Sequence, residues 1–202
     1  MGTTYRDAEP DTLNVVARAM RQWHQNLTEA GVRVGVLMAE NAEGDAIKSG
    51  GYAVLACIKV VSLKDRVSKE YDAELLIDGA VWDGLREEQQ LSLADHELSH
   101  IDLRPLPPKQ LAALRHDDPG APWWQLDDLG RPKLKTVLGD WNAGDGFKAV
   151  VERHGKHAIE YVNLAGVKTK ADECKARHEA EVAAQPPIDF WPDGEVPPGD
   201  AA

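Results

Sequence analysis

Residues 96–100 read His-Glu-Leu-Ser-His, and this motif constrains the fold of the 202-residue chain more than any other feature. Residues four positions apart share one face of an α-helix, so His96 and His100 can both reach one zinc ion from a helix. Glu97 lies one step around that helix, where a carboxylate can deprotonate a water bound to the ion without being a ligand itself. The motif therefore predicts a helix that carries two metal ligands and a general base.

The residues around the motif predict an amphipathic helix over 85–103 that Pro105 ends. Its apolar stripe consists of Leu91, Ala94, Leu98 and Ile101. At about 100° per residue the two histidines point nearly opposite to this stripe, so we expect the helix to pack on the core and present its ligands to a cleft. Asp95 is expected either to hydrogen-bond a ligand histidine or to face solvent.

The rest of the chain predicts a mixture of helices and strands. The expected elements are a helix over 11–30, strands over 32–38, 54–61 and 71–77, an irregular stretch over 105–132, a helix over 146–153 and a strand over 158–164. The strand over 54–61 is apolar on both faces and is expected to be central, whereas 71–77 alternates in part and is expected at an edge. Trp123 and Trp124 either line a cleft or anchor the irregular stretch. Lys133 and Lys135 are expected on a solvated strand face.

The acidic charge is unevenly distributed along the chain. Residues 171–202 hold eight acidic and two basic side chains, so they contribute -6 to the net charge of -11. We expect a domain over 1–168 and an acidic, Pro-rich tail over 169–202 that is partly helical and then disordered. Direct binding to nucleic acid is not expected, because phosphate contacts require a positive surface, although the remaining charge of only -5 weakens this exclusion.

The sequence also bears on the cellular compartment. It has no apolar run of the roughly 20 residues that span a bilayer and no secretory signal, so we expect no membrane association. Cys57 and Cys174 are too few for a disulfide framework. A reducing cytoplasm fits both cysteines.

Two segments resemble the putative phage metallopeptidases. They are KVVSLKDRVSKEYDAELLIDGAVWDGLREEQQLSLADHELSHIDL, with its Ile-Asp-Gly strand end and its Asp-His-Glu-Leu-x-His-Ile core, and GRPKLKTVLGDWNAGDGFKAVVERHGKHAIE. The resemblance implies an α+β, zincin-like fold in which a small twisted sheet packs on the metal-bearing helix. It also implies Zn²⁺ and a hydrolase, with His96 and His100 as ligands and Glu97 as the general base. For a phage-encoded protein, the expected cytoplasm is that of the host cell.

The third metal ligand is expected at Asp140. The resemblance implies a His-Asp pair near 139–140, and this chain has Gly139-Asp140. A carboxylate oxygen is an acceptable zinc ligand. The alternatives are Asp145, His154, His157 and His116. In a purely structural role, Asp140 would be a turn or N-cap residue before the helix near 147.

The function expected from these residues is zinc-dependent hydrolysis of a peptide bond. A protein or peptide substrate would lie beside the strand over 71–77, and Glu97 would deprotonate the attacking water. The alternative is a non-catalytic zinc-binding interaction protein that binds a host protein. The missing histidine at position 139 and the acidic surface favour this alternative.

Overall fold

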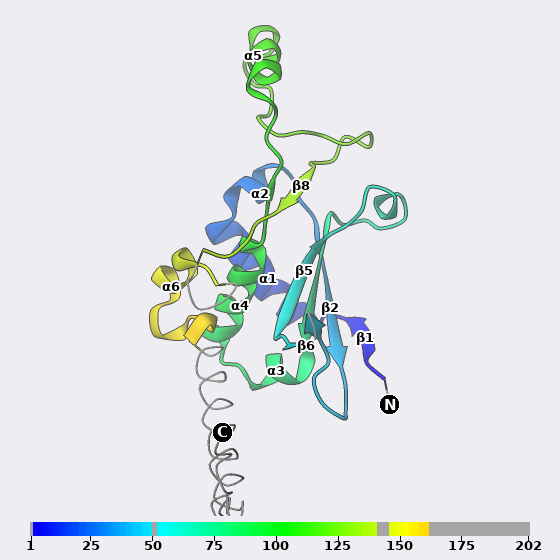
Figure 1. The fold of residues 1–202 in the computed structure, drawn as a ribbon, viewed down its shortest axis with the longest axis vertical. Helices are drawn as coiled ribbons and strands as arrows, with labels where there is room; N and C mark the ends of the chain where they lie inside the picture. Colours follow the sequence, from blue (N-terminus) through cyan, green and yellow to red (C-terminus); the bar gives the residue numbers. More distant parts are fainter. Residues whose placement is uncertain (1, 50–51, 141–145, 162–202) are drawn as a thin grey trace, which may run out of the picture. The chain divides into compact units, whose positions relative to one another are not determined.

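The computed structural model describes residues 2–49, 52–140 and 146–161. It shows a mixed α+β fold with a four-stranded sheet and several helices, which confirms the expected α+β class (Figure 1). In chain order the elements are β1 (Thr4–Asp7), α1 (Pro10–Trp23), α2 (Gln25–Glu29), β2 (Val34–Glu40), β3 (Lys48–Ser49), β4 (Tyr52–Ala53), β5 (Ala56–Val60), η1 (Asp65–Val67), β6 (Ala73–Asp78), α3 (Gly79–Gly84), α4 (Glu87–Ser99), β7 (Ile101–Leu103), α5 (Pro108–Asp117), β8 (Leu134–Thr136), α6 (Lys148–His154) and η2 (Gly155–His157).

The strand order of the main sheet is β1-β2-β6-β5. β2 and β6 are parallel, with Val36 opposite Leu75, and the two outer pairs are antiparallel. β6 is therefore interior and β5 is an edge strand, so the expected positions of these two strands are wrong. The polar Glu74 suggested an exposed face on β6, but its carboxylate accepts hydrogen bonds from Lys69 at 2.6 Å and Tyr71 at 2.7 Å. These partners allow a charged residue in an interior strand.

The main core lies between one face of the sheet and the helices α1 and α4 (Figure 1). Buried side chains from both layers meet there, including Val16, Ala19, Val36, Leu75, Ile77, Leu93 and Leu98. Leu98 is inside the His-Glu-Leu-Ser-His motif and is fully buried. Packing of Leu98 in the core therefore sets the rotation of α4 about its axis, and with it the directions of the two histidines.

The first predicted helix is interrupted. α1 begins with Pro10 in its first turn and ends at Trp23, and α2 begins at Gln25. His24 between them leaves helical geometry, with φ -121° and ψ 51°, and its ring bonds to Asp95 on α4. The break therefore coincides with a buried side-chain contact that local periodicity does not reveal.

The motif helix is shorter than predicted. α4 ends at Ser99, and Ile101–Leu103 forms β7, which pairs antiparallel with β8. Pairing with β8 supplies the backbone hydrogen bonds of these residues, so the helix ends well before Pro105. Residues 92–98 are all buried, so the face opposite the apolar stripe is covered rather than open to solvent.

The stretch over 105–132 is more regular than predicted. It contains α5, which has no buried residue, and two isolated bridges that pair Pro105 with Trp124 and Leu126 with Pro132. Trp123 and Trp124 pack against the main core and edge-to-face on each other at 5.6 Å. Of the two expectations for these tryptophans, the packing supports the anchoring role.

The final described segment contains α6, which confirms the helix expected over 146–153, and the 3-10 helix η2. Residues 159–161 are helical, so the strand expected over 158–164 is wrong for this part. The predicted boundary at residue 168 and the tail lie outside the described residues. No helix in residues 2–49, 52–140 or 146–161 is long and apolar enough to cross a membrane.

Candidate metal centre

The two motif histidines lie at the C-terminal end of α4, and their rings meet edge to face with centroids 5.0 Å apart. The Nε2 atoms of His96 and His100 are 3.3 Å apart. Two nitrogens bound to one tetrahedral zinc ion at about 2.0–2.1 Å are roughly 3.3 Å apart. One turn of helix therefore brings the two side chains to a separation at which a single ion can contact both.

An oxygen acceptor lies at the other ring nitrogen of each histidine. Nδ1 of His96 is 3.1 Å from Oε1 of Glu160, and Nδ1 of His100 is 3.0 Å from the carbonyl oxygen of Val137. Carboxylate and carbonyl oxygens only accept, so these contacts place the protons on Nδ1 and the lone pairs on Nε2. Two facing lone pairs repel unless a proton or a cation lies between them. The donor set therefore fits zinc, whose histidine ligands normally donate their second N–H to such an oxygen.

Residues 146–161 cover the two imidazoles and include a partner that sequence reasoning missed. The ring of Phe147 packs edge-to-face on His96 at 5.6 Å and on His100 at 4.7 Å. Its backbone N–H donates to Oε1 of Glu160 at 3.3 Å. Glu160 is only 5% exposed, and its Oε2 has no hydrogen-bond partner within the described residues. The sequence does contain one indication of this partner, because Glu160 lies in the otherwise largely apolar run of residues 158–161. Burial of a carboxylate in such a run is costly unless it has a partner.

Glu97, the predicted general base, is buried on α4. Its charge acts on the edge strand β5. Burial raises the pKa of the Cys57 thiol, Lys59 lowers it, and the negative charge of Glu97 raises it further. The Glu97 carboxylate is therefore close enough to β5 to act on that strand electrostatically.

Asp95 forms a buried polar cluster beside the motif. Its carboxylate is 2.8 Å from Nε2 of His24, 2.9 Å from Nε2 of His154 and 3.2 Å from Nε of Arg153. Burial alone would raise the pKa of Asp95, but the hydrogen bonds from His154 and His24 and the charge of Arg153 lower it below its ordinary value. The expectation that Asp95 faces solvent is wrong, because the side chain ties the α1–α2 junction and α6 to α4.

A comparison with known families identifies the chain. The sequence model of the putative phage metallopeptidase family matches residues 4–172, a span that includes both α4 and the segment that covers its histidines. The chain belongs to this family. No curated protein and no solved structure matches it. Membership indicates a metallopeptidase-like role, and such a role implies a bound metal, commonly zinc.

In this family member the predicted third ligand, Asp140, has a second role. Its Oδ1 accepts a hydrogen bond from the backbone N–H of Lys148 at 2.9 Å, at the start of α6. The contact satisfies a backbone N–H in the first turn of α6, although the N-cap residue of this helix is Phe147 rather than Asp140. Across the three described ranges, no group of three His, Cys, Asp or Glu side chains is arranged to hold a metal. Asp140 as a ligand therefore stays a prediction.

The other candidate ligands are dispersed. His154 contacts Asp95 through its Nε2. His157 has a buried Nδ1 without a hydrogen-bond partner in the described part of the chain. His116 is exposed on α5 and lies 3.1 Å from the Asp117 carboxylate. Asp145 lies outside the described residues.

Proposed function

We propose that the chain is a zinc-dependent, zincin-type peptidase with His96 and His100 as metal ligands and Glu97 as the general base. The observation that carries this proposal is the pair of Nε2 atoms 3.3 Å apart, with an oxygen acceptor at each Nδ1. These two oxygen acceptors favour the deprotonated Nε2 atoms that zinc requires. Membership of a metallopeptidase family supports the same assignment.

In this proposal the residues of the chain hold the substrate and move one proton. A zinc ion on the two histidines supplies a Lewis acid and lowers the pKa of water. Glu97 receives the proton of the attacking water on a carboxylate oxygen and then donates it to the amine leaving group. The burial of Glu97 limits exchange of that proton with bulk solvent.

The substrate is proposed to lie along β5 rather than along the strand over 71–77. An extended peptide can pair its main chain only with an edge strand. β5 is at the end of the strand order, whereas β6 is paired on both sides. β5 packs against α4, the helix that carries Glu97, so a peptide on this edge would lie beside the helix of the proposed base.

Asp140 is proposed as the third ligand. Its position is three residues beyond Val137, which contacts His100, so at most roughly 10 Å of extended chain separates them. Ligating carboxylates are themselves normally hydrogen-bonded, and the Lys148 contact meets that requirement. We expect Asp140→Ala to lower zinc affinity at least tenfold in a chelator competition. Unchanged affinity with a stability loss of about 1 kcal/mol would assign Asp140 to capping of α6 alone.

The function itself is tested with Glu97→Gln. This variant should retain its zinc, measured by elemental analysis, because Glu97 is not proposed as a ligand. It should lose at least roughly a hundredfold in the cleavage rate of a denatured protein substrate, the scale of a lost general base. Exposed Glu88→Gln on the same helix serves as the matched control. Cleavage by the Glu97→Gln variant at the wild-type rate would refute the role of Glu97.

A non-catalytic metal site is the second candidate, and Gly139, at the position where the family resemblance implies a histidine, favours it. Chelation separates the two functions. A catalytic site loses its metal reversibly while the fold remains, whereas loss of a structural metal unfolds the chain. Circular dichroism before and after chelation, followed by zinc addition, distinguishes these outcomes.

A further inference from the structure

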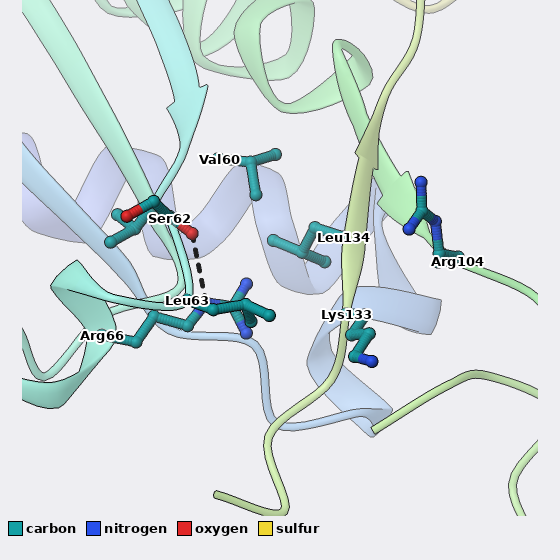
Figure 2. A pocket seen from close by; sticks show the side chains of 8 residues that line it. Val60, Ser62, Leu63, Arg66, Arg104, Lys133 and Leu134 are labelled. Carbon is teal, nitrogen blue, oxygen red and sulfur yellow. Dashed lines mark hydrogen bonds between the residues drawn. The ribbon is translucent and has the colours of Figure 1, made fainter. Parts of the chain in front are cut away.

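A hollow of about 200 Å³ lies where β5 ends and β8 begins (Figure 2). Its lining combines apolar side chains, among them Val60, Leu63 and Leu134, with three cationic ones. The cations are Arg66, Arg104 and Lys133, and no carboxylate is part of the lining. The hollow is therefore apolar in its walls and positive in its charge.

Two of the three cations have no internal counter-charge. Arg66 is buried and lies 3.0 Å from the Asp127 carboxylate and 3.4 Å from that of Asp72. Within the described part of the chain, the side chains of Arg104 and Lys133 form no ion pair. Lys133 is half-buried, and the backbone N–H of Arg104 donates to its carbonyl oxygen at 2.8 Å, so the two residues are held side by side. Both charges are thus available to a ligand.

β8 connects the hollow to the proposed metal centre. Lys133 directly precedes β8, and Val137 directly follows it and contacts His100. The three residues of β8 separate Lys133 from Val137, and the four residue steps between these two positions span about 13 Å in extended chain. The other wall includes Val60, the last residue of β5, and Leu63, three residues further along the chain. A peptide extended along β5 that reacts near His100 would therefore place a side chain about four residues away at the hollow.

We infer that this hollow is a subsite for an acidic side chain of the substrate, about four residues from the cleaved bond. This inference rests on the proposed peptidase function and adds a substrate preference to it. A carboxylate would form charge-assisted hydrogen bonds with Arg104 and Lys133 while its methylene groups contact the apolar walls. An acidic peptide fits better than a nucleic-acid backbone, because only two of the cations that line the hollow have no ion pair within the described residues, and the chain carries a net charge of -11.

The inference is tested first by binding, which does not depend on cleavage. The zinc-loaded Glu97→Gln protein is titrated with fluorescent Ala- and Thr-rich peptides that carry one Glu at successive positions, each matched by a Gln peptide. At one of these positions, the Glu peptide should bind about tenfold more tightly than the matched Gln peptide, the scale of a charge-assisted contact. Adding R104Q and K133Q together should abolish the difference. K135Q is the matched control, because Lys135 on β8 pairs with Asp102 instead of lining the hollow.

Cleavage profiling then separates the subsite from the peptidase function. The wild-type enzyme is incubated with a peptide library from denatured proteins, and its cleaved peptides should be enriched in Asp or Glu about four residues from the cleaved bond. The R104E and K133E double variant should instead select Lys or Arg at that position. Equal affinity of Glu and Gln peptides, or no binding of either, refutes the subsite even when the wild-type enzyme cleaves. Binding that favours Glu without any cleavage refutes only the peptidase function. Binding of duplex DNA that competes with the Glu peptide would instead assign the hollow to phosphate.

Discussion

Replacement of Glu160 tests whether the fold orients a zinc ligand through this carboxylate. Oε1 of Glu160 is 3.1 Å from Nδ1 of His96 and accepts the N–H of Phe147 at 3.3 Å. Glu160→Gln retains an oxygen acceptor but removes the negative charge beside the imidazole of His96, so we expect about tenfold weaker zinc binding, or about 1.4 kcal/mol. Glu160→Ala leaves two buried N–H groups without an acceptor, and we expect a loss nearer a hundredfold, or about 2.7 kcal/mol.

The measurement is competition against a chromophoric chelator at neutral pH, with thermal unfolding of the metal-free protein recorded in parallel. Glu152→Gln is the matched control, because Glu152 is an exposed carboxylate on α6. The metal-free Glu160→Gln protein should unfold close to the wild-type temperature, since the hydrogen bonds retain an acceptor. A dissociation constant equal to that of wild type, in a folded Glu160→Gln protein, would refute the orienting role of Glu160.

Two further predictions concern the sheet. Lys69 and Tyr71 lower the pKa of Glu74, so its charge stabilises the fold above its unfolded pKa of about 4.5, and this contribution is lost as the pH falls below that value. Glu74→Gln should therefore lower the free energy of unfolding, measured by urea denaturation, by about 1 kcal/mol at pH 7 and by almost nothing near pH 3. Exposed Glu70→Gln is the control. An equal loss at both pH values would contradict the ionic explanation. A Cβ on Gly35 would come within 2.6 Å of the Tyr71 ring, so Gly35→Ala should destabilise by about 1–3 kcal/mol, whereas Gly84→Ala, with open space around it, should not. Equal unfolding temperatures for the two alanine variants would contradict this packing argument.

The part of the site that lies on one helix could be predicted from the sequence. The four-residue spacing of His96 and His100 sets their common face, and the apolar stripe sets which side of α4 meets the core. Both signals are local, so neither depends on knowledge of the remaining fold. The structure agrees with them, since Leu98 is fully buried and the two Nε2 atoms are 3.3 Å apart.

Contacts between distant segments could not be predicted from local patterns. Glu74 makes β6 look half-exposed, and only the positions of Lys69 and Tyr71 explain how an interior strand holds a carboxylate. Strand order depends on such partners. Local patterns therefore predict β5 at the centre of the sheet and β6 at its edge, the reverse of the order in the structure. Glu160 is 64 residues from His96, and no periodicity connects them.

The same long-range contacts show why the motif helix is polar yet buried. Asp95 and His96 follow each other on α4, and both find their partners in the segment of residues 146–161, in His154 and Glu160 respectively. A buried carboxylate is stable only with such partners, so packing of this segment and orientation of the histidine depend on one another. Zinc on His96 would add its binding energy to the same set of contacts, because a ligand that binds only the folded state stabilises it. The covering segment is therefore best regarded as part of the metal centre rather than as a lid over it.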